Sequence, residues 1–328
     1  MSKEKIVHKT SVGGQALIEG VMMNGPKGAA ISVRHTDGHI ITEMSDVKHA
    51  KDKFRPLGWP FVRGIVNFIE SMIVGYKSLM RAAELSGQLD ADDPENMSKF
   101  DRWLNDHLGP KMFAAITAVI SVLVTGFCVV LFFYGPSYLV DLIDSKLLNN
   151  AVAEFHPFFE GIMKMIIVVL YMLAVSQMKD IKRVFMYHGA EHKSIFCYEK
   201  NLDLTVENVR TCKRFHPRCG TSFIFIVLIT SIIVTSIVVL VFPVLKNPEM
   251  RLIWTLVKIA VLPLVTGISY ELIRYAGKHD NIITKIFSAP GLWMQRITTK
   301  EPTDDMIEVA IASIKAVITD NPDDDKLD

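Results

Sequence analysis

The stretch GTSFIFIVLITSIIVTSIVVLVFPVL, residues 220 to 245, contains no Asp, Glu, Lys or Arg. A helix needs about 20 apolar residues to cross the hydrocarbon core of a bilayer. A second charge-free stretch runs over residues 112–140, and two further apolar segments, 159–178 and 252–271, carry one lysine each. The sequence therefore predicts four transmembrane helices in a mainly α-helical membrane protein.

The composition of the whole chain agrees with a membrane protein. Half of the residues are hydrophobic, the mean hydropathy is +0.28 and the formal net charge is +1. So small a net charge gives no reason to expect nucleic acid as a partner, because such a binding face needs an excess of basic residues. The two lysines inside the predicted spans, Lys164 and Lys258, are expected to extend toward the outer interface.

The distribution of basic residues predicts the orientation. Of the 36 Lys and Arg residues, 31 lie in residues 1–111, in residues 179–221 or after Tyr270. Lys and Arg near membrane ends are retained on the cytoplasmic side. Both termini and the loop 179–221 are therefore predicted to be cytoplasmic. The polar first 25 residues do not resemble a secretory signal, so the first span is expected to act as the insertion signal.

The N-terminal residues 1–58 are predicted to form a small cytoplasmic β meander. The run AAISVRHTDGHIITEM, residues 29–44, alternates apolar and polar side chains around Asp37–Gly38, which predicts a hairpin with a two-residue turn. Gln15 to Met23 is predicted as a third antiparallel strand. Gly13 and Gly14 before it are interpreted as a flexible entry to that strand.

The segments that flank the predicted spans complete the domain organisation. Residues 59–85 predict an amphipathic helix that lies on the membrane or re-enters it, and 86–111 predict an acidic linker with a short helix. Residues 112–271 form the four-helix membrane domain with the loop 179–221. In residues 272–328, Pro290–Gly291 is expected to break the chain before an amphipathic helix that begins at Asp304 and a disordered tail.

A motif in the loop 179–221 predicts a metal site. His188-Gly-Ala-Glu191-His192 places two histidines four residues apart, so both imidazoles lie on one helix face with Glu191 beside them. The H-x-x-E-H order is that of the inverted zinc peptidases, in which the glutamate is a general base and a distant glutamate completes the ligands. Glu271 is the candidate for the distant ligand, and Glu199 and Glu19 compete with it.

The same loop holds a second cluster of ligand types, Cys212-Lys-Arg-Phe-His216-Pro-Arg-Cys219. Thiolate and imidazole bind zinc, although this spacing matches no standard zinc finger. Cys128 lies in the first predicted span and Cys197 in the loop, where thiols stay reduced, so no disulfide is expected. The alternative for both clusters is structural: the cysteines are small core residues and the histidines form hydrogen bonds.

Three motifs taken in order resemble one known family. GGQALIEGVMMNGP (13–26), YHGAEHK (187–193) and HPRCGTSF (216–223) are similar to the YqhQ-like family of bacterial membrane proteins, described as predicted metal-dependent enzymes. The resemblance extends from Gly13 to about Ala316. It implies a bacterial cytoplasmic membrane protein and groups these residues in one site: Glu19, His188, Glu191, His192, His216 and Cys219. Asn24 stands where the family often has a basic residue, which weakens any expectation of an anion site there.

These observations predict a multi-pass membrane protein with a divalent-metal site, zinc or a similar ion, on its cytoplasmic side. If the site is catalytic, metal-assisted hydrolysis of a membrane-bound peptide or lipid-linked substrate is the expected reaction, with Glu191 as general base. A scaffold or assembly factor whose His/Cys cluster is structural is the alternative. A transporter is a third and weaker reading, because four spans with two interior lysines offer little to line a path.

Overall fold

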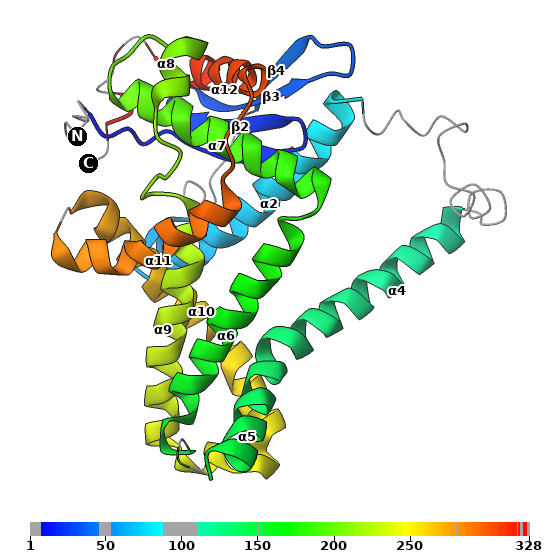
Figure 1. Cartoon of the computed structure of the whole chain (residues 1–328), viewed down its shortest axis with the longest axis vertical. Coiled ribbons are helices and arrows are strands. Elements are labelled where there is room, and N and C mark those ends of the chain that lie inside the picture. Colours follow the sequence, from blue (N-terminus) through cyan, green and yellow to red (C-terminus); the bar gives the residue numbers. More distant parts are fainter. Residues whose placement is uncertain are drawn as a thin grey trace. The chain divides into compact units, whose positions relative to one another are not determined.

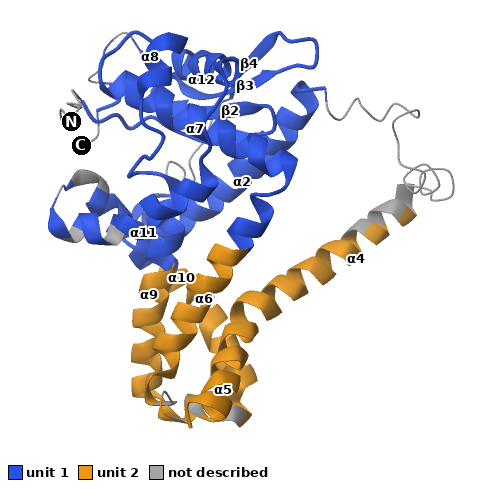
Figure 2. Ribbon diagram, viewed as in Figure 1, with its two compact units in different colours: residues 1–89, 171–227, 266–328 blue, residues 90–170, 228–265 orange. Residues whose placement is uncertain are grey.

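A computed structural model gives the fold of the chain (Figure 1). It describes residues 8–45, 54–87, 110–149, 151, 153–279, 281–319, 321 and 324–326. The chain divides into two compact units (Figure 2). Unit 1 comprises Met1–Leu89, Tyr171–Val227 and Thr266–Asp328, and unit 2 comprises Asp90–Leu170 and Leu228–Val265. As predicted, the described chain is mainly helical with a small antiparallel sheet.

The sheet of unit 1 has one strand more than the sequence predicted. Its order is β1 (Gly13–Leu17), β2 (Gly20–Gly25), β3 (Gly28–Arg34) and β4 (Ile40–Ser45), each antiparallel to the next. The single strand predicted from Gln15 to Met23 is wrong, because the chain turns back at Glu19, which has a φ of 50°. Leu17 consequently pairs with Gly20.

The predicted hairpin around Asp37–Gly38 is confirmed, since β3 and β4 pair from Arg34 and Ile40 outward. Its turn is longer than the predicted two residues. The connection runs from His35 to His39, and within it Gly38 has the positive φ, 96°.

Helices cover both faces of this sheet. On one face α7 (Lys179–Glu199) packs on β1 and β2, and α12 (Asp304–Val317) packs on β2 and β3. On the other face α2 (Val62–Leu85) packs on the alternate side chains of β1 and β3. The alternation follows from the period of two in a strand. The first face buries Val21, Met23 and Ala30 with Tyr187, Ile307 and Ile314, and the second buries Leu17, Met22, Ile31 and Val33 with Ala82.

The predicted helix within 59–85 is confirmed as α2, and its position relative to a membrane stays a prediction. A 3₁₀ turn, Arg55–Gly58, precedes it. The acidic linker and short helix predicted for 86–111 lie mostly outside the described residues.

Four helices are long and apolar enough to cross a membrane, as the sequence predicted: Ala118–Leu147, His156–Val175, Gly220–Val241 and Arg251–Ala276. The first comprises most of α4 (Pro110–Val129), a π-helical turn (Val130–Tyr134) and α5 (Gly135–Leu147). The others are α6 (His156–Val175), α9 (Gly220–Val241) and most of α10 (Arg251–Lys278). Short 3₁₀ turns lie between them at Ala153–Phe155, Pro243–Lys246 and Pro248–Met250.

A buried ion pair in unit 2 contradicts the expectation that Lys258 extends to the interface. Its Nζ lies 2.6 Å from Glu160 Oε1 and donates to the carbonyl of Phe133 at 2.8 Å. The indole of Trp254 donates to the other carboxylate oxygen of Glu160 at 3.2 Å. Lys164 Nζ lies 3.9 Å from the same carboxylate. The Lys258 ammonium group is therefore paired with a buried carboxylate inside the helical unit, where the sequence had predicted that it would be solvated at the edge.

The expected break at Pro290–Gly291 is wrong, because α11 (Ile282–Thr298) continues through both residues. Packing requires the glycine there: a Cβ on Gly291 would lie 2.5 Å from Ser222 Cα. A tertiary contact thus outweighs the local breaking signal.

The predicted C-terminal amphipathic helix is confirmed as α12. The tail after it was predicted to be disordered, which is wrong for its described residues 324–326. Asp325 is buried and accepts a hydrogen bond from Thr10 Oγ1 at 2.7 Å, and Lys326 pairs with Thr10 in an isolated bridge.

Candidate metal centre

The H-x-x-E-H motif lies on α7, the central helix of unit 1. From Gly189 to Cys197 each residue of α7 is buried. Gly189 allows this burial, because a Cβ there would lie 2.0 Å from the carbonyl oxygen of Lys300. The close packing fixes the face of α7 that carries His188 and His192.

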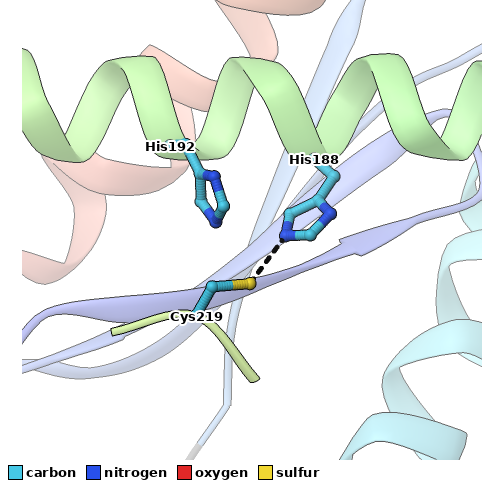
Figure 3. A group of neighbouring side chains, drawn as sticks. All are labelled: His188, His192 and Cys219. Atoms are coloured by element: carbon cyan, nitrogen blue, oxygen red, sulfur yellow. Dashed lines mark hydrogen bonds between the residues drawn. The ribbon is translucent and has the colours of Figure 1, made fainter. Parts of the chain in front are cut away.

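Cys219 meets these two histidines from the segment just before α9 (Figure 3). His188 Nε2 lies 3.2 Å from Cys219 Sγ, and the His188 and His192 rings are 4.4 Å apart between centroids. One ligand atom from each residue lies within 4.8 Å of the others. Two ligands of one tetrahedral zinc ion lie about 3.3–3.7 Å apart, so a small contraction closes a Cys-His-His site.

Backbone carbonyls orient both histidine rings. His188 Nδ1 lies 2.9 Å from the carbonyl oxygen of Thr298, and His192 Nδ1 lies 2.5 Å from that of Arg214. Because a carbonyl accepts, each Nδ1 carries the hydrogen, which leaves the lone pair on Nε2. This second hydrogen bond is the usual means by which proteins orient histidine ligands of metals.

The electrostatics of His192 and Cys219 favour their ligating forms. Burial lowers the pKa of His192, and the neighbouring His188 lowers it further, which favours the neutral ring. Burial by itself raises the pKa of the Cys219 thiol, but His192 and Thr221 outweigh it and bring that pKa below its usual value. Neutral imidazoles with a thiolate suit zinc and similar borderline ions.

Glu191 lies beside this group without a full set of partners. It is 5% exposed, and its Oε2 has no hydrogen-bond partner among the described residues. Burial raises its pKa to about 8, although His188 and the backbone N–H of Gly14 act in the opposite direction. Glu191, His192 and Cys219 line a cavity of about 190 Å³. A carboxyl group that faces a cavity next to metal ligands is suitably placed for proton transfer.

His216 lies next to this group but outside it. Its ring centroid is 5.6 Å from that of His192, and its Nε2 lies 3.6 Å from Glu199 Oε2. The side chain of Gln295 binds both the N–H and the carbonyl of His216, at 2.7 and 2.8 Å. Glu199 also binds Arg218 and the N–H of Thr10. His216 and Arg218 thus line one side of the cavity, and the buried Glu199 binds both of them.

The two other glutamates predicted as ligands are held elsewhere by arginines. Both oxygens of Glu271 accept from the guanidinium of Arg63. Both oxygens of Glu19 accept from Arg183, and Tyr187 donates to one of them at 3.3 Å. The structure therefore brings Cys219, and neither of these carboxylates, to the two histidines.

A second group of metal-ligand types lies at the β3–β4 hairpin: His35, Asp37 and His39. Asp37 Oδ1 lies 3.2 Å from His35 Nδ1 and also contacts His39 Nδ1. Asp37 and His39 are more than half exposed. Hydrogen bonds across an exposed turn explain this group, which the sequence had interpreted as a turn.

Sequence reasoning missed the groups that orient the site. The carbonyls of Thr298 and Arg214 belong to residues whose side chains carry no metal signal. Gly14 was interpreted as a flexible entry, whereas its backbone lies against Glu191: a Cβ there would be 3.1 Å from Glu191 Cδ. The pair Gly13–Gly14 was the available signal for this close approach.

These features define a mainly helical protein that has four helices long and apolar enough to span a membrane and a candidate metal centre in unit 1. Residues 59–320 match the family described as "Protein of unknown function (DUF1385)", and the chain belongs to this family. It is 38% identical over 320 residues to "Uncharacterized protein YqhQ" of Bacillus subtilis (strain 168), a match that covers 97% of this chain and 95% of that protein. The family expected from the motifs is confirmed. No solved structure matches the chain.

Proposed function

We propose that this chain is a metal-dependent hydrolase of the bacterial cytoplasmic membrane. His188, His192 and Cys219 hold a divalent ion, with zinc the best fit to the donor set. Glu191 is the general base. The basic residues of the termini and of 179–221 support a cytoplasmic location for these segments and for the site.

One arrangement carries this proposal: three oriented ligand atoms beside a buried carboxyl group, with a cavity at their side. A structural zinc site is closed by four protein ligands, whereas a catalytic one has three and a position for water or substrate. Among the described residues no fourth His, Cys, Asp or Glu ligand atom joins the group. The cavity beside the group leaves the fourth coordination position to water or substrate.

The chemistry assigned to the chain follows from the position of Glu191. Its carboxylate takes a proton from the attacking water and returns it to the leaving group, which is the usual task of a glutamate next to metal ligands. A metal ion at the three ligands supplies polarisation of the scissile carbonyl. His188 and His192 are kept in their ligating tautomer by Thr298 and Arg214 throughout.

A site near a membrane suits a substrate that is itself bound to the membrane. The four apolar helices support this setting. The substrate classes are a membrane-bound peptide and a lipid-linked molecule, and each presents a hydrolysable carbonyl or phosphoryl group to the cavity.

Metal analysis of purified variants tests the proposal. We expect one equivalent of ion in the wild-type protein by mass spectrometry of the digested sample, and less than a tenth of that in His188→Ala, His192→Ala and Cys219→Ser. Glu191→Gln should retain the ion. His39→Ala is the matched control, because it removes a histidine from the exposed hairpin group. A wild-type protein that is folded but binds no stoichiometric ion would refute the metal site.

A scaffold with a structural ion is the second candidate. The clasp of Gln295 on His216, which joins α11 to the loop before α9, favours it. Cobalt substitution separates the two functions, since an open cobalt site changes its visible spectrum when acetohydroxamate binds and a closed one does not. An unchanged spectrum would favour the scaffold.

A transporter is a third candidate, and the observation in its favour is the buried pair of Lys258 and Glu160. Such intramembrane pairs occur in ion pathways. If the function resides in the metal centre of unit 1, replacement of Lys258 or Glu160 should leave the metal content of the protein unchanged.

A further inference from the structure

The first strand of the sheet has an edge that no other described strand pairs with. β1 stands at the end of the order β1-β2-β3-β4. Its first residues, Gly13 and Gly14, are exposed and line the cavity together with Glu191 and Cys219. The free edge of β1 therefore begins at the candidate metal centre.

The register of the hairpin decides which backbone groups point away from the sheet. In an antiparallel pair with a two-residue turn, the two residues that flank the turn exchange hydrogen bonds, and every second residue does so after them. Leu17 and Gly20 flank the turn. Leu17, Gln15 and Gly13 consequently bond to β2, while Ala16 and Gly14 direct their N–H and C=O groups to the free edge.

An independent contact agrees with this register. The N–H of Gly14 interacts with the Glu191 carboxyl, which is possible because it points away from β2. The carbonyl of Gly14 and the N–H of Ala16 have no hydrogen-bond partner among the described residues. These two groups lie on either side of Gln15. In a parallel pair of strands, one residue of the neighbouring strand donates its N–H to the first of two such groups and accepts from the second with its carbonyl.

The charged side chains of the cavity offer an anionic substrate no binding group beyond the proposed metal ion. Among its lining residues the charged side chains are Glu191 and Arg218. The guanidinium of Arg218 is already bound to the Glu199 carboxylate and, at 3.2 Å, to the carbonyl of Thr10. Apart from the proposed metal ion, a phosphate would thus find no uncommitted cation among these side chains, whereas a neutral amide needs none.

We propose that the substrate is an extended peptide that adds to the free edge of β1, bonding to the Gly14 carbonyl and the Ala16 N–H, so that one of its carbonyls lies at Glu191 and the metal ligands. This inference rests on the proposed function, because it places the scissile bond at that site. Addition of a strand to a sheet edge is a common way to bind peptides: the backbone bonds supply affinity without sequence preference. The absent side chains of Gly13 and Gly14 leave space for such close approach.

Ala16→Pro tests the edge directly. It removes an outward N–H and leaves the β1–β2 bonds of Gln15 and Leu17 in place, as proline is tolerated where an edge strand faces outward. Ala16→Val is the matched control, because it enlarges the side chain but retains the N–H. Both variants should keep the metal content of the wild type.

The probes are acetyl-Leu-Ala-hydroxamate and an alkyl hydroxamate of equal length without amides, measured by competition on the metal-loaded protein. We expect the wild type and Ala16→Val to bind the peptide probe at least tenfold more tightly than the alkyl probe, and Ala16→Pro to lose that difference. An unchanged affinity of Ala16→Pro for the peptide probe would overturn the inference. Tighter binding of the alkyl probe would overturn it in favour of a lipid substrate.

A second measurement does not depend on the metal. A peptide carboxamide with a benzophenone group, added to chelator-treated protein, should photolabel residues 11–17 in the wild type and not in Ala16→Pro. If the peptide labels these residues but the native protein contains no bound ion, peptide binding at the edge of β1 is supported and the metal-dependent hydrolase is refuted. If the native protein contains the ion but is not labelled, the metal site is supported and peptide binding at this edge is refuted. The two failures are therefore distinguishable.

Discussion

Replacement of Glu191 by Gln should stabilise the metal-free protein, increasingly so as the pH rises. In the folded protein burial raises the pKa of Glu191 to about 8, against 4.5 for an exposed glutamate. The folded state therefore holds a proton that the unfolded chain has lost. Stability contributed by a proton bound in the folded state falls as pH rises, here from about pH 4.5 until it levels off above pH 8.

The magnitude follows from the difference of about 3.5 in pKa, each unit of which is worth about 1.4 kcal/mol. At pH 8 the wild-type carboxyl group costs about 4 kcal/mol relative to pH 4.5, and at pH 7 about 3 kcal/mol. Glutamine carries no such cost, because it stays neutral at each pH.

Thermal unfolding with a chelator present, at half-unit steps from pH 5 to pH 9, measures this difference. His192, His216 and Cys219 also titrate, but they are common to both proteins, so the wild-type curve minus the Glu191→Gln curve isolates the carboxyl group. The melting temperature of the wild type should fall below that of the variant progressively between pH 5 and pH 8. Added zinc should abolish the difference, because a cation favours the carboxylate. A difference curve that is flat or rises with pH would refute the burial argument.

Two further predictions concern unit 2 and the orientation of the chain. Lys258→Met leaves the Glu160 carboxylate buried without its main partner, so it should destabilise the protein by about 3 kcal/mol and lower the melting temperature. The double variant with Glu160→Gln should regain most of this stability. A single variant that melts like the wild type would contradict the presence of the buried ion pair. Reporters fused after Asp328 and inserted near Asp203 should read cytoplasmic and one near Asn149 external, whereas an external signal at Asp203 would contradict the location of the metal centre.

The sequence predicts those features of the site that depend on short spacing. His188, Glu191 and His192 share a face because residues four apart do so on any α-helix. The four apolar helices are equally local, since length and composition define them. Both predictions need no knowledge of which segments meet in the folded chain.

The choice of the third ligand is not local. The H-x-x-E-H order pointed to Glu271, whereas the resemblance to the family grouped Cys219 with the histidines, and the residues alone did not decide between the two. The structure separates them through Arg63, a residue of α2 that occupies both oxygens of Glu271. A partner some 200 residues away thus removes a carboxylate from the candidates. Arg183 does the same to Glu19.

The orientation of the histidines has a source that no motif marks. The last carbonyls of a helix have no intrahelical partner. Thr298 is the final residue of α11, and its carbonyl accepts from His188 Nδ1. Arg214 lies in the irregular segment between α8 (Val206–Thr211) and α9, and its carbonyl accepts from His192 Nδ1. Unused backbone acceptors, rather than dedicated side chains, therefore set the tautomers.

This origin of the orientation has a consequence for how the centre forms. The hydrogen bonds that direct both Nε2 atoms are internal to the folded unit and do not involve an ion, so the ligands are arranged before any ion binds. Pre-arranged ligands lose little conformational entropy on binding, which raises affinity without a fourth protein ligand. Side-chain changes at Thr298 or Arg214 leave these carbonyls in place, whereas a shift in the end of α11 moves one of them. The geometry of the centre thus depends on where α11 ends. Because α11 continues through Pro290 as far as Thr298, the carbonyl of Thr298 is in position to orient His188.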